Sequence, residues 1–148
     1  MTFYREKPFM QKEDDSATVN NVRAFLAGHW RRTLRAGKSI SSLQSPRMDG
    51  MPRSSSSVNR VDDNIIKQAD IALEVSSTVH AIHCLDSKSE FILSKLYLAD
   101  PAWTNTEIMQ AMGYEESRYR DLKRLAFLMF AEAYSVEDLR VFRDFNDF

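Results

Sequence analysis

The sequence predicts an all-α protein, because residues that form turns are scarce and apolar residues recur at helical spacing. The chain of 148 residues contains only 4 Gly and 4 Pro, whereas the two types together average roughly 12% of a globular protein. Apolar residues make up 43% of the chain, which suffices for a hydrophobic core at about the usual length of one domain. We therefore expect consecutive helices joined by few turns.

A basic amphipathic helix is expected near the N-terminus, after a loosely ordered segment over residues 1–15. From Ser16, apolar residues follow i, i+3, i+4 spacing over roughly 18 residues, and Gly37 stands where a C′ glycine would end the helix. Its predicted inward positions are Val19, Val22, Phe25, Leu26, Trp30 and Leu34. Its remaining positions carry Arg23, Arg31, Arg32 and Arg35.

The next segment is predicted to be irregular. After a short turn over residues 39–43, residues 45–60 read SPRMDGMPRSSSSVNR. Two prolines, Gly50 and a serine run disfavour regular structure, so this stretch is expected to form a linker or an extended arm.

Residues 61–100 predict two further helices. Asp62 or Asp63 can cap the first, which reaches about Leu85. Its inward positions are expected to be Ile65, Ile66, Ala69, Ala72, Leu73, Val79 and Ile82. The sequence from Ser87 to Glu90, SKSE, is a capping box that opens the second helix, and Pro101 stops it. That helix carries Phe91, Ile92, Leu93, Leu96 and Tyr97.

Three helices are expected after Pro101. Thr104 opens a short helix through a second capping box, TNTE, and this helix ends at Gly113. A long helix then runs from about Glu115 to Tyr134, with its inner face formed by Tyr119, Leu122, Ala126, Met129, Phe130 and Ala133. The segment from Ser135 to Asp138 is predicted to cap a last helix. Its apolar stripe, Phe142, Phe145 and Phe148, is expected to be buried, and a homodimer formed through it is the alternative hypothesis.

The net charge of −1 conceals a strong asymmetry along the chain. Residues 1–60 contain 11 bases and 5 acids, whereas residues 61–148 contain 9 bases and 16 acids. From residue 20 to residue 60 there are eight Lys or Arg residues, and Asp49 is the only acid. Contact with phosphates is the first interpretation of this bias, and docking on RNA polymerase or simple solvation are the alternatives.

Several classes of protein are disfavoured. No stretch has the about 20 apolar residues that a membrane span needs, and the N-terminus, MTFYREKPFMQKEDD, lacks the apolar centre of a signal peptide. The single Cys84 cannot form an internal disulfide and suits a reducing compartment. We therefore expect a cytoplasmic protein without a membrane partner.

Neither a metal site nor a catalytic site is expected. His80, His83 and Cys84 follow i, i+3, i+4 spacing on one helix, which could offer three ligands to zinc, but no obvious fourth ligand accompanies them. A catalytic Cys–His pair would also need an orienting group and an oxyanion hole, which nothing suggests. No glycine-rich phosphate loop occurs, so no cofactor is predicted.

The most informative segment is TNTEIMQAMGYEESRYRDLKRLAFL, residues 104–128. A capped short helix, a glycine and a long helix with basic residues follow one another at the spacing of a helix-turn-helix over about residues 104–134. The tight turn needs one residue with positive φ, which Gly113 adopts without steric cost. An ordinary helical hairpin with a solvated charged face is the alternative interpretation.

A helix-turn-helix assigns roles to the exposed side chains of its second helix. The candidates for reading bases are Glu116, Ser117, Arg120, Asp121 and Arg124. The candidates for binding phosphates are Thr104, Arg118 and Lys123 together with Arg31, Arg32, Arg35, Lys38 and Arg53. Acidic residues dilute the positive charge of this helix, although a carboxylate can accept a hydrogen bond from cytosine.

The helix-turn-helix segment resembles the promoter-reading domain of bacterial sigma factors. The chain from about Asn21 to Leu139 resembles the ArpU family of phage late-gene regulators, on the segments NVRAFLAGHWRRTLRAGKSISSLQSP, DGMPRSSS at residues 49–56, and YLADPAWTNTEIMQAMGYEESRYRDLKRLAFLMFAEAY. This resemblance implies a sequence-specific DNA-binding transcriptional regulator of packaging or lysis genes in phages and prophages, with no enzymatic activity. Sigma-like base contacts would fall on Glu116, Ser117, Arg120 and Asp121.

Together these observations predict three parts: residues 1–15, a basic helix and arm over residues 16–60, and a helical domain over residues 61–148. Double-stranded DNA is the predicted partner, in the cytoplasm of a bacterial host and associated with its nucleoid. The alternative is a sigma-like adaptor that binds RNA polymerase or another regulator without reading DNA itself.

Overall fold

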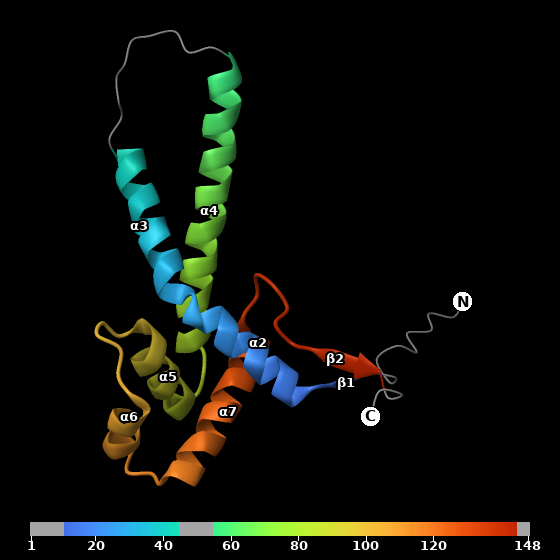
Figure 1. Cartoon of the computed structure of the whole chain (residues 1–148), viewed down its shortest axis with the longest axis vertical. Helices are drawn as coiled ribbons and strands as arrows, with labels where there is room; N and C mark the ends of the chain where they lie inside the picture. Colours follow the sequence, from blue (N-terminus) through green and yellow to red (C-terminus); the bar gives the residue numbers. More distant parts are fainter. Residues whose placement is uncertain (1–10, 45–54, 145–148) are drawn as a thin grey trace.

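The computed structural model describes residues 11–44 and 55–144, with side chains described for residues 11–37 and 63–144. The fold is mainly helical, as predicted, and adds one small antiparallel sheet (Figure 1). The helices are α2 (Asp15–Ala27), α3 (His29–Gln44), α4 (Ser55–His83), α5 (Ser87–Leu93), α6 (Asn105–Met112) and α7 (Glu116–Ala133), with a π-helical turn, η1 (Ser94–Leu98), after α5. The strands are β1 (Gln11–Glu13) and β2 (Phe142–Asp144).

The predicted N-terminal helix is wrong in its extent, because it is two helices that meet at Gly28. Asp14 caps α2 by accepting the Ala17 N–H, so the helix begins before Ser16. At the other end, the Arg32 guanidinium donates to the Phe25 carbonyl at 2.6 Å. A Cβ on residue 28 would lie 3.0 Å from Arg32 Nη1, so glycine leaves room for this contact. Gly37, expected to end the helix, lies inside α3.

Helices α3 and α4 form a long hairpin that extends from the rest of the molecule (Figure 1). Helix α4 begins at Ser55 rather than at Asp62 or Asp63, so the irregular arm predicted over residues 45–60 is wrong for residues 55–60. The rest of that arm, residues 45–54 with most of the DGMPRSSS segment, lies outside the described residues.

Several residues expected to face the core are exposed on this hairpin. Trp30 is 58% exposed, Leu34 60%, Ile66 59% and Leu73 55%, and Ile65 is also exposed. The predicted spacing is helical, but a projecting hairpin gives each helix a neighbour on one side only. Apolar side chains that point away from the neighbouring helix therefore remain exposed to solvent. Helical spacing alone does not show which apolar side chains will have a neighbour to pack against.

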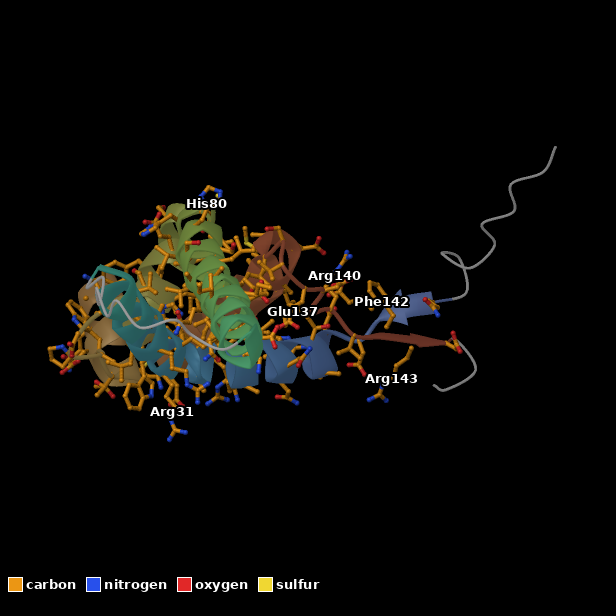
Figure 2. All side chains as sticks on the ribbon, turned by 90° about the horizontal axis from the view of Figure 1, so that it is seen from above. Arg31, His80, Glu137, Arg140, Phe142 and Arg143 are labelled. Atoms are coloured by element: carbon orange, nitrogen blue, oxygen red, sulfur yellow. The ribbon has the colours of Figure 1, made fainter. Side chains whose placement is uncertain are left out.

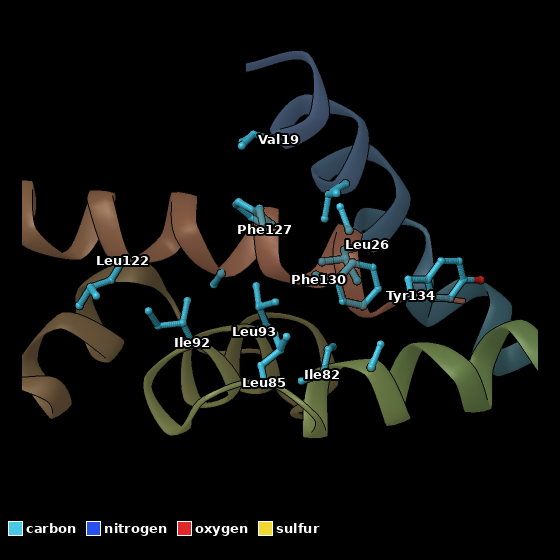
Figure 3. Packing of buried hydrophobic residues seen from close by; sticks show 14 of the residues in the cluster. Val19, Leu26, Ile82, Leu85, Ile92, Leu93, Leu122, Phe127, Phe130 and Tyr134 are labelled. Carbon is cyan, nitrogen blue, oxygen red and sulfur yellow. The ribbon is translucent and has the colours of Figure 1, made fainter. Parts of the chain in front are cut away.

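The core forms along the inner side of α7, which packs against α2, α4 and α5 (Figure 3). Phe127 and Phe130 of α7 and Leu26 of α2 are fully buried, each at 1% exposure or less. Burial of one such side chain contributes about 1.5–3 kcal/mol. The predicted inward residues that are buried here are Val19, Val22, Leu26, Ile82, Ile92, Leu93, Tyr119, Leu122, Ala126 and Phe130.

Local capping determines where the short helices begin. The predicted box at Ser87 is wrong, because Asp86 caps α5 by accepting the Ser89 N–H at 3.3 Å. The Glu90 carboxylate contacts His83 Nδ1 instead, at 3.0 Å. The box at Thr104 is confirmed: Glu107 N–H donates to Thr104 Oγ1 and Thr104 N–H donates to the Glu107 carboxylate, at 3.2 and 2.9 Å.

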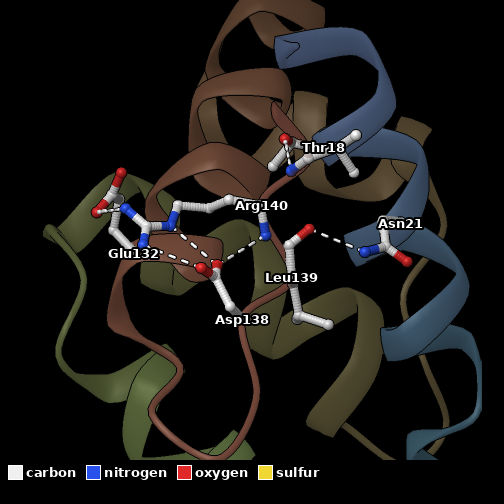
Figure 4. A network of polar contacts seen from close by, with 7 residues as sticks. Thr18, Asn21, Glu132, Asp138, Leu139 and Arg140 are labelled. Atoms are coloured by element: carbon white, nitrogen blue, oxygen red, sulfur yellow. Dashed lines mark hydrogen bonds and ion pairs between the residues drawn. The ribbon is translucent and has the colours of Figure 1, made fainter. Parts of the chain in front are cut away.

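The predicted C-terminal helix is wrong. Residues 134–141 form no helix, and β2 pairs antiparallel with β1, with Gln11 opposite Asp144. The Asp138 carboxylate accepts from the backbone and side chain of Arg140, at 3.1 and 2.9 Å, so it does not close a capping box (Figure 4).

Two side chains of α2 hold this C-terminal segment against the body (Figure 4). Thr18 Oγ1 accepts the Val141 N–H at 2.9 Å, and Asn21 Nδ2 donates to the Leu139 carbonyl at 2.8 Å. Phe142, expected in the core, is 43% exposed. Phe145 and Phe148 lie outside the described residues, and the homodimer through this stripe stays a prediction.

Residues 11–15, assigned to a loosely ordered terminus, form β1 and begin α2. In the part of the chain that the structure describes, no helix combines the length and the apolar character that crossing a membrane requires.

Candidate nucleic-acid interface

Helices α6 and α7 are joined by a tight turn at Gly113. This glycine has φ +73°, in the left-handed region that the sequence predicted for it, and its N–H donates to the Met109 carbonyl at 2.9 Å. Ile108 before the turn is fully buried, and Tyr119 and Leu122 after it are buried on the inner side of α7. The inner side predicted for α7 is therefore confirmed at Tyr119 and Leu122, and Ile108 of α6 belongs to the same buried cluster.

Asn105, at the start of α6, ties the two helices together. Its Oδ1 accepts a hydrogen bond from the Tyr119 hydroxyl at 2.7 Å and from Lys123 Nζ at 3.1 Å. Burial, with a smaller contribution from Tyr97, raises the pKa of Tyr119 to about 12, so this phenol stays protonated and donates. Sequence reasoning missed Asn105, because no local spacing signals a contact between residues this far apart.

The predicted base-reading residues all lie on the exposed side of α7. Glu116, Ser117, Arg120, Asp121 and Arg124 are each exposed. Arg120 Nη2 lies 2.7 Å from Glu116 Oε1, one helical turn away, and both side chains are about three quarters exposed, at 74% and 75%. Arg124 Nη2 donates to Ser16 Oγ of α2 at 3.4 Å.

A cleft of about 460 Å³ lies between α2, α6 and α7. It brings together five of the predicted residues, but Ser117 and Arg118 do not line it. It also adds α2, which the spacing of residues 104–134 does not connect with this helix pair. Its lining consists of Val19, Arg23, Asn105, Met109, Glu116, Tyr119, Arg120, Asp121, Lys123 and Arg124.

Two basic residues of the cleft lining, Arg23 and Lys123, lie near one buried ring, that of Phe127. Arg23 Cζ lies 5.5 Å and Lys123 Nζ 5.9 Å from the centroid of Phe127. Burial, and then the positive charge of Arg23, lower the pKa of Lys123. The cleft therefore places Lys123 near a second cation that disfavours its charged form.

The predicted phosphate-binding residues of α3 differ in whether their side chains are exposed or are used within the fold. Arg31 points away from the body near the Trp30 ring, with 5.8 Å between its Cζ and the centroid (Figure 2). Arg32 is used within the fold, because it stacks on Phe25 at 4.1 Å and donates to the Phe25 carbonyl. Arg35 is exposed on the same helix.

Of the four remaining phosphate candidates, two have exposed side chains and two have side chains outside the described set. Arg118 is exposed on α7, and Thr104 is exposed while its hydroxyl caps α6. Lys38 lies within α3, with its side chain outside the described set, and Arg53 lies outside the described residues altogether.

The His/Cys group on α4 does not gather around a common point. Cys84 Sγ lies 3.4 Å from His80 Nε2, but His83 contacts Glu90 of α5 instead. Across residues 11–37 and 63–144, no group of three His, Cys, Asp or Glu side chains is arranged to hold a metal ion.

Comparisons with known proteins relate most of the chain to one family of regulators. No protein-family model and no solved structure matches it. A protein of Enterococcus hirae, named "Putative autolysin regulatory protein ArpU", is 30% identical over 125 residues, which cover 84% of this chain and 91% of that protein. A protein of the same name from Streptococcus phage O1205 is 31% identical over 123 residues, 82% of this chain and 89% of that protein. These names describe regulatory proteins rather than enzymes, and the chain belongs to the ArpU family.

Proposed function

We propose that this protein is a sequence-specific DNA-binding transcriptional regulator of late packaging or lysis genes in phages or prophages. In this proposal α6 and α7 form a helix-turn-helix, and α7 enters the major groove. The observation that carries it is the convergence of basic side chains from α2 and α7 on one cleft, which α6 also lines. The phage origin of one relative, and the reference to autolysin in both names, support the choice of lysis genes.

The expected contacts with DNA fall into two chemical classes, contacts with bases and contacts with phosphates. Ser117, Arg120 and Arg124 are the expected base contacts, while Arg118, Lys123 and Arg31 hold phosphates and set the register. The Glu116–Arg120 pair does not prevent base reading, because an exposed ion pair contributes only about 0–1 kcal/mol. A bidentate Arg contact with guanine contributes about 1–3 kcal/mol of discrimination and can replace it.

Selection of binding sites from random duplex DNA tests sequence-specific binding. We expect the full chain to enrich one motif, and fluorescence anisotropy to show tighter binding to that motif than to a scrambled duplex. Arg120→Ala should reduce this preference, whereas Arg31→Ala should weaken binding to both duplexes and flatten its salt dependence. Equal losses on both duplexes for both variants would refute this division of roles.

The control of late genes needs a separate test. A reporter placed behind the upstream region of phage packaging or lysis genes should change its expression when the protein is supplied. The Arg120→Ala variant should lose this response at an equal protein level. A reporter that responds equally to both proteins would contradict control through base reading.

A sigma-like adaptor that binds RNA polymerase is the second candidate. Glu115, Glu116 and Asp121 favour it, because these exposed acids lower the positive potential of α7. Mobility shifts with late-promoter DNA distinguish the two: binding by the protein alone supports the regulator, and binding only with added polymerase supports the adaptor.

A further inference from the structure

The cleft between α2, α6 and α7 gathers positive charge from two separate segments of the chain. Arg23 comes from α2, and Arg120, Lys123 and Arg124 come from α7. Helix α2 lies outside the helix pair, and tertiary packing places it across α7 (Figure 1). Arg23 is therefore a cation of this site that the spacing of residues 104–134 could not indicate.

Arg23 and Lys123 have no carboxylate partner within the described residues. Arg23 contacts the Phe127 ring, and Lys123 contacts that ring and the neutral amide of Asn105. The acids that line the cleft are Glu116 and Asp121, and Glu116 is already paired with Arg120 at 2.7 Å. The fold thus places two like charges near one ring, Lys123 on a half-buried and Arg23 on an exposed side chain, and neither forms an ion pair with the acids that line the cleft.

An anion between these cations would remove their mutual repulsion. A lysine ammonium offers three donors, and a guanidinium offers five in a planar fork that matches phosphate oxygens. Charge-assisted hydrogen bonds to such an anion are stronger than bonds between neutral groups. The volume of about 460 Å³ leaves ample room for a phosphate group.

We propose that this cleft is a phosphate-binding site in which Arg23 and Lys123 donate to the phosphate oxygens. The source of the phosphate is the DNA backbone, so the inference rests on the proposed function, and free inorganic phosphate is the other source with the same chemistry. A phosphate held here by α2 would lie directly beside the exposed side of α7 and would set its register in the groove.

Binding of a random-sequence duplex at increasing salt tests the DNA source. The variant is Arg23→Gln, and its matched control is Lys67→Gln, which removes one positive charge from an exposed side chain of α4. We expect Arg23→Gln to lower the slope of log K against log salt by about 0.9, the value for one neutralised phosphate. Lys67→Gln should leave the slope unchanged. Lys123→Met, which keeps the apolar stem over Phe127, should reproduce the effect of Arg23→Gln.

Circular dichroism and thermal melting of each variant verify that it is folded. Equal slopes for the wild-type protein and both cleft variants would overturn the DNA contact. If Arg120→Ala loses sequence preference while these slopes stay equal, the proposed function stands and this inference fails.

Titration of the full chain with inorganic phosphate, followed by the NMR shift of Lys123 Cε, tests the site without DNA. We expect a saturable shift in the wild-type protein and in Lys67→Gln, and none in Arg23→Gln. Phosphate binding without any binding of duplex DNA would support the site and refute the proposed function. If Arg23→Gln changes neither the NMR titration with inorganic phosphate nor the salt slope of duplex binding, the site does not exist.

Discussion

Gly113 determines the geometry of the α6–α7 pair through its backbone alone. A Cβ added at this position would meet no atom within 4 Å, so steric contact does not explain the glycine. Its φ of +73° does, because a β-carbon makes this left-handed conformation costly. The single residue therefore decides the angle at which α7 leaves α6.

Gly113→Ala should destabilise the protein by about 1–2 kcal/mol, the cost of the left-handed region for an L residue. Gly113→Asn is the matched control, because asparagine visits this region more readily, and its loss should be smaller. Urea denaturation gives both free energies of unfolding. Equal losses for the two variants would show that backbone strain is not the cause.

His29 makes stability sensitive to mild acid. The side chain is 5% exposed, its Nδ1 has no hydrogen-bond partner, and burial, followed by the charge of Arg32, lowers its pKa. Its folded-state pKa thus lies below the unfolded value of about 6.5. The unfolded state binds more protons as the pH falls below that value, so stability is complete above it and declines below it.

His29→Gln should reduce this decline, because glutamine does not titrate. Thermal unfolding between about pH 7 and pH 5 should show a larger fall in Tm for the wild-type protein than for the variant. Two parallel profiles would mean that other groups, common to both proteins, cause the whole effect.

At the scale of elements, the junction between α2 and α3 depends on Arg32. Its guanidinium covers Phe25 and donates to the carbonyl at the C-terminal end of α2, where a cation is favoured by the helix dipole. The neighbouring Arg31 is exposed, and its side chain lies near the ring of Trp30. Of these two adjacent arginines, only Arg32 therefore bonds to the end of α2, while Arg31 stays at the surface.

Arg32→Gln should cost about 1–3 kcal/mol of stability, the range for removing a charged hydrogen bond with its packing. Arg31→Gln should change the free energy of unfolding by less than about 0.5 kcal/mol, as is usual at exposed positions. Chemical denaturation of both variants compares them directly. A larger loss at Arg31 would contradict the structural role assigned to Arg32.

At the scale of the whole molecule, the basic N-terminal region and α7 should contribute differently to DNA affinity. The combined variant Arg31→Gln, Lys38→Gln and Arg53→Gln should lower the salt slope by about 0.9 for each phosphate that is no longer neutralised. Its preference for the selected motif over a scrambled duplex should stay unchanged. Anisotropy at several salt concentrations measures both quantities, and a weaker preference would place base reading in the N-terminal region.

Local signals in the sequence predicted local structure well. The capping box at Thr104 and the left-handed turn at Gly113 depend on residues within a few positions of each other, and both are confirmed. The two wrong capping predictions, at Ser87 and Ser135, show the limit of such signals. In each, a neighbouring group competes for the same bonds: Asp86 caps α5 first, and Asp138 bonds to Arg140.

Features that depend on distant contacts were not predictable. The C-terminal segment is held against the body by Thr18 and Asn21 of α2, more than a hundred positions earlier, and its strand β2 pairs with β1. Its own residues, read alone, predicted a helix. Two other features also depend on how the helices pack against one another. These are the exposed apolar side of the α3–α4 hairpin and the contribution of Arg23 to the cleft.

The sequence by itself determined the helical class, the buried side of α7, the turn at Gly113 and the membership of a family of regulators. These follow from periodicity, capping and composition, which act over one or two helical turns, and from the resemblance of three segments to that family. Only the tertiary structure decided that α2 crosses α7, that Arg32 serves the fold rather than the surface, and that Arg23 and Lys123 both lie near the Phe127 ring. The physical reason is that charge and burial depend on neighbours in space, and packing brings together residues that the chain keeps far apart.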